Sequence, residues 1–145
     1  MVNETQILNE LIAVCRDNIE SVEDAAQQTK SDELQTFFNE LVEHWKKILE
    51  ALRAEVIYQG GIPTESGTLI GDVHRLYAKF KAAVLRNERE AVLDELEQLS
   101  SRALDTFDEV LKRELPPQAE GILRLQHGQV SEVHERILAF RKSGR

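Results

Sequence analysis

The four histidines are the side chains with which this sequence could most directly bind a transition metal. Di-metal carboxylate centres in helical bundles use Glu-x-x-His pairs, because a histidine three residues after a glutamate faces the same cavity. The residues three places before His44, His74, His127 and His134 are Leu41, Gly71, Arg124 and Ser131. The sequence therefore contains no Glu-x-x-His pair, and the regular di-metal motif is absent.

Carboxylates and histidines at looser spacings could still form an irregular site for iron or manganese. Glu40 and Glu43 stand beside His44 in one helical pattern, whereas His127 and His134 lie seven residues apart in another. The candidate ligands are Glu20, Glu23, Glu43, His44, Glu97 and His134. The alternative, which we favour, is that the histidines lie at the edges of apolar stripes and that the glutamates are solvated surface charges.

A second candidate is the stretch "GGIPTESGTLIGDVHRLY", residues 60–77, which interrupts the helical pattern. Its glycines lack the following lysine of a phosphate-binding loop and the spacing of a dinucleotide-binding fingerprint. His74 and Arg75 come near its end. The pair could hold an anionic ligand at a helix N-terminus. It could instead satisfy loop carbonyls and pair with acids of the preceding helix, and we favour this structural role.

Nucleophilic catalysis finds little support in the sequence. Cys15 falls on an apolar stripe, where a cysteine is more often a small core side chain than a reactive thiolate. It is the single cysteine, so no intramolecular disulfide is possible, and a reducing compartment is expected. Ser100 and Ser101 lie within a helical pattern that has no histidine nearby in the sequence.

Five predicted helices must position these residues. Apolar residues at spacings of three and four predict a single domain, 1–145, with helices at about 5–29, 32–59, 68–86, 88–114 and 117–141. Gly60 and Gly61 end the second helix, and Pro116 and Pro117 separate the last two. Four of the segments are long and carry one apolar stripe each, which a four-helix bundle buries most simply.

The connection between the second and fourth segments suggests the topology. It contains a loop and a helix long enough to travel back along the bundle, which would make the two long helices that it joins parallel. We therefore expect an all-α, ferritin-like up-down four-helix bundle with a long crossover that contains an extra helix. The structural rival is a fifth helix packed on the end of the bundle.

Composition excludes several other classes of protein. The formal net charge of −8 argues against a nucleic-acid partner, because phosphate backbones require clustered lysine and arginine. No stretch approaches the roughly 18 consecutive apolar residues of a membrane span. The N-terminal residues lack the basic and apolar regions of a signal peptide. We expect a cytoplasmic protein that meets neither nucleic acid nor membrane.

The order of motifs resembles a known family. "AAQQTKSDELQTFF", "AEVIYQGGIPTESGTLIGDVHRLY" and "LPPQAEGILRLQHGQVSEVHERI" are similar to segments of a bacterial family of ferritin-like four-helix-bundle proteins classed as a domain of unknown function. The resemblance spans roughly Leu8 to Leu138. It implies the fold, an inherited link to iron or to stress responses, and a family histidine at His134. Ile19 and Ser100 stand where acids are common in the family, which implies an incomplete metal site.

Together these observations predict a binding, assembly or stress-associated module without a complete di-iron site. No catalytic residue or cofactor is expected, although iron or manganese could bind. The alternative is a metal-binding oxidase or iron-handling protein with an irregular carboxylate and histidine site. Amphipathic helices leave room for a homodimer or another protein partner along an exposed side.

Overall fold

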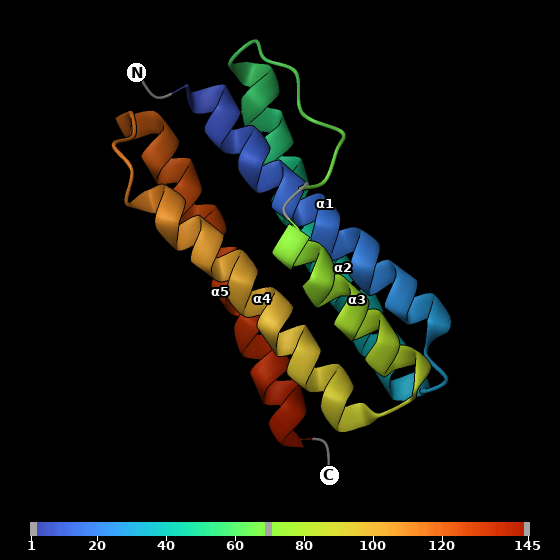
Figure 1. Ribbon diagram of the computed structural model, residues 1–145. Coiled ribbons are helices and arrows are strands. Elements are labelled where there is room, and N and C mark those ends of the chain that lie inside the picture. Colours follow the sequence, from blue (N-terminus) through green and yellow to red (C-terminus); the bar gives the residue numbers. More distant parts are fainter. Residues whose placement is uncertain (1–2, 69–70, 144–145) are drawn as a thin grey trace.

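The protein is all-helical over the residues that the computed structural model describes, 3–68 and 71–143. The helices are α1 (Glu4–Gln28), α2 (Asp32–Tyr58), α3 (Gly71–Leu85), α4 (Arg89–Leu111) and α5 (Pro117–Ser143). Four of them are long and α3 is short (Figure 1). No helix of the described part combines the length and the apolar character needed to cross a membrane.

Local side chains determine where the first two helices begin and end. The Asn3 side chain accepts the Thr5 backbone N–H at 2.9 Å, and Ser31 Oγ accepts the Leu34 N–H at 3.1 Å. Both are N-cap bonds, which satisfy backbone donors that have no partner within the helix. Gly60 ends α2 with a positive φ of 82°, a conformation that glycine adopts without a steric penalty.

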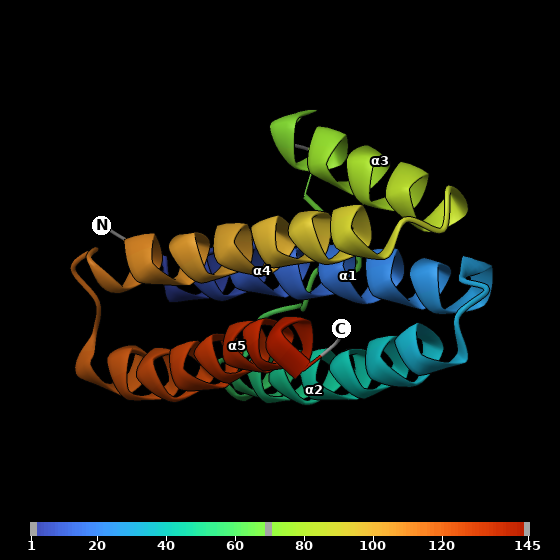
Figure 2. The same ribbon diagram turned by 90° about the horizontal axis from the view of Figure 1, so that it is seen from below.

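The long helices lie lengthwise in two antiparallel pairs, α1 with α2 and α4 with α5. The colours of Figure 1 show that α2 and α4 run in the same direction, because the crossover returns the chain along the molecule between them. Figure 2 shows α3 outside the four long helices, beside α1 and α4, rather than capping an end. α3 thus lies on the flank of the long helices.

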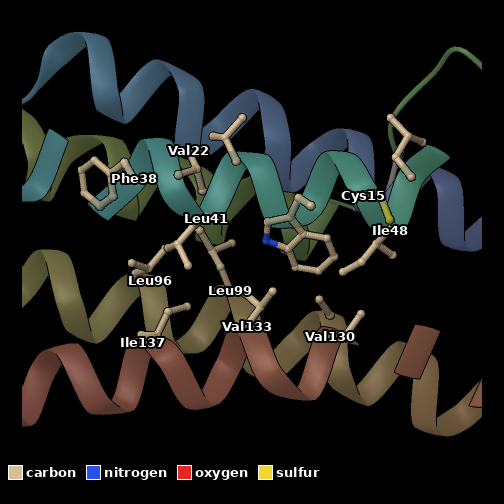
Figure 3. Close-up of a cluster of buried hydrophobic side chains, with 14 of the residues drawn as sticks. Cys15, Val22, Phe38, Leu41, Ile48, Leu96, Leu99, Val130, Val133 and Ile137 are labelled. Atoms are coloured by element: carbon tan, nitrogen blue, oxygen red, sulfur yellow. The ribbon is translucent and has the colours of Figure 1, made fainter. Parts of the chain in front are cut away.

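Apolar side chains fill the space between the long helices. Trp45, Phe38 and Phe107 are almost fully buried, and Figure 3 shows Leu41 and Val133 among the side chains that meet between the helices. The buried polar side chains among the described residues are Asp17, Asn18, Ser100 and Gln126. Burial of apolar surface at about 25 cal/mol per Å² is the main force that holds the helices together.

Two predicted helix ends were wrong, each for a local reason. The third helix was expected from residue 68, but Thr68 is not helical and α3 begins at Gly71 in the described structure. Thr68 instead donates its backbone N–H to Asp17 on α1. Residues 69 and 70, also part of the predicted helix, lie outside the described residues. The fourth helix was expected to reach 114, but it ends at Leu111, where Lys112 and Arg113 close a tighter final turn.

Candidate functional site

The described part of the loop that follows α2, residues 59–68, is called the crossover loop. Polar side chains of α1 hold it against the long helices. Asn9 accepts the Thr64 N–H at 2.9 Å and donates to the Ile62 carbonyl at 3.2 Å. Arg16 Nε donates to the Thr64 carbonyl at 2.9 Å. One polar face of α1 therefore satisfies backbone groups of a loop that has no secondary-structure partner.

Asp17 is the centre of this attachment. The residue is only 7% exposed, and its Oδ2 accepts the Thr68 N–H at 2.8 Å. The Tyr77 hydroxyl on α3 donates to the same carboxylate. Burial raises the pKa of Asp17, although the hydrogen bonds from Thr68 and Tyr77 act in the opposite direction. The Tyr77 pKa is also raised, by burial first and then by the Asp17 charge.

Gly67 is required by the close approach of the loop to Asp17. A Cβ at this position would lie 2.0 Å from Asp17 Oδ1 and 3.0 Å from its Cγ. Because these atoms belong to a short, buried side chain, any larger residue must displace either the loop or the carboxylate. The absence of a side chain at Gly67 therefore permits the close contact between the loop and Asp17.

His74 lies next to this group, on the first turn of α3. Its Nε2 is 2.9 Å from the Thr68 carbonyl oxygen. A carbonyl oxygen only accepts, so Nε2 carries the hydrogen and donates it. The structure thus places His74 against a loop carbonyl, while the acids near the site come from α1 rather than from the preceding helix, α2. Arg75 is exposed.

An open cavity of about 550 Å³ lies between α1, α3 and the crossover loop. Side chains that line it and that carry polar groups are Asp17, Glu20, Ser21, Asp24, Ser66, Thr68, His74, Tyr77 and Lys81. Lys81 Nζ lies 3.7 Å from Asp24 Oδ2. Acids and hydroxyls therefore dominate this outer cavity.

A second, smaller cavity of about 190 Å³ lies on the other side of Asp17 and Tyr77. Apolar side chains of α1, α3 and α4 form part of its lining, namely Ala13, Val14, Val73, Leu99 and Ala103. The polar side chains of Glu10, Asn18, Arg102 and Thr106 also line it. Asp17, Thr68 and Tyr77 line both cavities. These three residues therefore form a shared wall between the outer and the inner cavity.

The six candidate metal ligands do not converge on one point. Glu23 and Glu43 both face the Lys46 ammonium group, at 3.4 and 3.8 Å. Glu97 lies 3.5 Å from the Arg141 guanidinium group. Within residues 3–68 and 71–143, no three histidine, cysteine, aspartate or glutamate side chains are grouped so that they could hold a metal ion.

The histidines proposed as ligands also have other neighbours. His134 Nδ1 lies 2.6 Å from Ser100 Oγ, and that hydroxyl is 3.0 Å from the Glu97 carbonyl of its own helix. His44 is half-buried, and burial lowers its pKa, with the Arg136 charge adding to the effect. Glu20 lines the outer cavity and, together with Glu23, a separate surface hollow that Lys46 also lines. The six candidates are thus distributed over several surfaces of the bundle.

The nucleophile candidates show no catalytic arrangement in the described structure. Cys15 is fully buried, and this burial raises the pKa of its thiol, which disfavours the reactive thiolate. Ser100 does have a histidine close in space, but the serine residue is only 2% exposed. Ser100 lines neither the outer nor the inner cavity.

Sequence reasoning missed Asp17, Tyr77, Asn9 and Arg16. Asp17 is the residue that it could have found, because it directly precedes Asn18 on the buried side of a helix that otherwise buries apolar residues. An acid so placed needs hydrogen-bond donors from another element. The crossover loop is the nearest segment whose backbone groups are not paired within a helix. Its contact with α1 depends on the three-dimensional path of the chain, which the sequence pattern does not show.

The fold and this site define a class of protein that is all-helical and whose crossover loop is fixed to its first helix. The family model described as "Domain of unknown function (DUF2383)" matches residues 3–113. The chain therefore belongs to that family, and the match contains α1 to α4 and all residues of the attachment. A comparison with curated proteins gave no match.

Proposed function

We propose that this protein is a ferritin-like four-helix bundle that acts as a binding module, with its ligand site in the outer cavity beside the crossover loop. The parallel direction of α2 and α4 supports the ferritin-like assignment, because that topology has one long crossover. The short α3 then belongs to the crossover rather than to the bundle.

The observation that carries the proposal is the built wall of the cavity. Asp17, Tyr77, Thr68 and His74 are joined by hydrogen bonds, so their polar groups have fixed positions. Concave sites with a few fixed polar groups and shifted pKa values are where proteins usually bind small molecules. Among the described residues, the core between the long helices is filled by apolar side chains.

Binding fits these residues better than metal-dependent catalysis. The acids that the irregular metal site would need are paired with Lys46 and Arg141 instead of facing one point. Each such carboxylate would have to leave its ion pair before it could coordinate a cation. The association with a second copy or another protein stays a prediction for the exposed sides of the bundle.

A ligand screen by NMR tests the proposal on the whole chain. A chemically mixed set of amines, carboxylates, sugars, nucleotides and aromatic compounds would be added at millimolar concentration to isotope-labelled protein. We expect at least one compound to shift backbone amide signals of residues 17–25 and 66–68 and of α3, with saturation. The proposal is wrong if no compound shifts them, or if all shifts gather on the outer faces of α2 and α5.

A further inference from the structure

We propose that the outer and inner cavities together bind a small organic amine with an apolar alkyl or aryl tail, with the ammonium group in the outer cavity and the tail in the inner one. This inference rests on the proposed function and specifies the ligand class for the same site. The two cavities differ in chemistry but share a wall, which is the arrangement that a molecule with one charged and one apolar end requires.

The outer cavity favours a positive charge. Asp17, Glu20 and Asp24 of α1 line it, whereas Lys81 is the one lysine or arginine among its described lining residues. The ammonium group of Lys81 lies 3.7 Å from Asp24 Oδ2. An ammonium group therefore already lies beside one carboxylate of the cavity wall. Glu20 is a further acid of this wall, and Asp17 is a third whose carboxylate accepts hydrogen bonds from Thr68 and Tyr77.

The spacing of the acids suits an organic cation rather than a metal ion. Asp17 and Asp24 are seven residues apart, or about 10 Å along a helix. Metal–oxygen bonds are about 2.0–2.6 Å long, so a metal ion needs its carboxylate ligands gathered around one point. Consistent with this, no group of three potential ligands was found in the described part of the chain. An ammonium group with three N–H donors can use carboxylate and hydroxyl acceptors spread over a wider area.

The inner cavity has the size and lining for the tail. Its volume is about 190 Å³, and its apolar side consists of Val14 of α1, Val73 of α3, and Leu99 and Ala103 of α4. Glu10 and Arg102 also line the cavity, so the tail would lie against the apolar side. An apolar cavity of about 150 Å³ binds benzene in another protein. One aromatic ring or a short alkyl chain therefore fits the space.

The wall between the cavities provides the passage for the ligand. Asp17 accepts hydrogen bonds there from Thr68 and from the Tyr77 hydroxyl. An ammonium group is a donor of the same kind, so it can replace Tyr77 at the carboxylate while the ring of Tyr77 turns aside. The ligand would then stabilise the buried charge of Asp17, which the free protein compensates with neutral donors and a nearby histidine.

Calorimetric titration of the whole chain with three probes tests the ligand class. The probes are 2-phenylethylamine, its neutral analogue 2-phenylethanol, and ethylamine, which has the head group without the ring. We expect 2-phenylethylamine to bind about tenfold more tightly than 2-phenylethanol, because a charged hydrogen bond contributes more than a neutral one. We expect ethylamine to bind more weakly still, because it does not fill the inner cavity.

Two substitutions separate the cavities. Ala13→Leu adds bulk to the inner cavity and should weaken 2-phenylethylamine binding by about tenfold while ethylamine binding is unchanged. Glu20→Gln removes a charge from the outer cavity and should weaken both amines by about threefold, because Glu20 is exposed and water screens its charge. Matched controls are Ala54→Leu on the exposed face of α2 and Glu135→Gln on the exposed face of α5, which should change nothing.

Each of the remaining outcomes would refute one named part of the proposal. Equal affinity for 2-phenylethylamine and 2-phenylethanol would refute the ammonium site, and equal affinity for 2-phenylethylamine and ethylamine would refute the tail site. Failure of all three probes would refute the amine class. The proposed function would survive that failure if the NMR screen finds another compound at the same residues, and it would fall only if that screen finds none. Thermal unfolding of each variant identifies any loss of binding that is caused by misfolding.

Discussion

The carboxylate of Asp17 is buried, and burial opposes its negative charge. The free energy of unfolding should therefore depend on pH through this group. Its pKa in the folded protein is raised above its ordinary value of about 3.9. A group of this kind binds its proton more tightly in the folded than in the unfolded state. Its stabilising contribution is therefore complete below the ordinary pKa and is lost as the pH rises through the folded pKa.

Asp17→Asn should remove this pH dependence. We expect the free energy of unfolding of the wild type, minus that of the variant, to fall as the pH rises from about 3.5 toward neutrality. Urea unfolding at a series of pH values measures the difference. His74, Tyr77 and Glu20 face Asp17 and are present in both proteins. A difference that is constant over this range would contradict the assignment.

Gly67 supplies a second test at the scale of a single residue. Gly67→Ala would place a Cβ against the Asp17 carboxylate, and we expect a loss of about 1–3 kcal/mol in the free energy of unfolding. Gly128→Ala on α5 is the matched control, because the space around Gly128 is open. Replacing a glycine inside a helix should stabilise the protein by about 0.5–1 kcal/mol. Chemical denaturation of both variants decides the matter; equal effects would rule out the close approach.

At the scale of secondary-structure elements, the loop depends on α1 for its position. Asn9→Ala removes an acceptor for the Thr64 N–H and a donor for the Ile62 carbonyl. We expect amide hydrogen exchange to accelerate in residues 62–68 but not in α2, because the core does not change. Asn39→Ala on the exposed face of α2 is the control. Unchanged exchange at Thr64 would show that the loop is held by other contacts.

The helices themselves could be predicted from the sequence to within three residues, because each carries an apolar stripe of regular spacing. Residues such as Leu41 and Val133 belong to that pattern and lie in the core as expected. The attachment of the loop could not be predicted. Asn9, Arg16 and Asp17 meet partners about 50 positions away, and no periodicity encodes which backbone groups they reach.

At the scale of the whole molecule, the distribution of acids determines how the protein meets metal ions. Glu23, Glu43 and Glu97 each form an ion pair with a lysine or an arginine. The side chains in these ion pairs are partly exposed to solvent. We expect anaerobic Fe(II) loading followed by desalting to leave far less than one iron per chain. We also expect His134→Ala to leave that value unchanged.

Elemental analysis of the loaded and desalted protein provides the measurement. Retention of one or two iron atoms per chain, lost in His134→Ala, would overturn the binding proposal in favour of the irregular metal site. Glu135→Gln is an adequate control for non-specific surface binding, because Glu135 is exposed on the same helix. A loss of iron in both variants would indicate surface binding alone.

The single tryptophan gives the molecule a built-in optical signal. Trp45 is 1% exposed and packed among apolar side chains, so its indole is shielded from water and from quenchers such as iodide while the bundle is intact. It is absent from the linings of both the outer and the inner cavity. Its emission should therefore shift to longer wavelength only when the helices separate, and stay constant while the cavities fill. Fluorescence would then follow unfolding and ligand occupancy as separate events in one unlabelled sample.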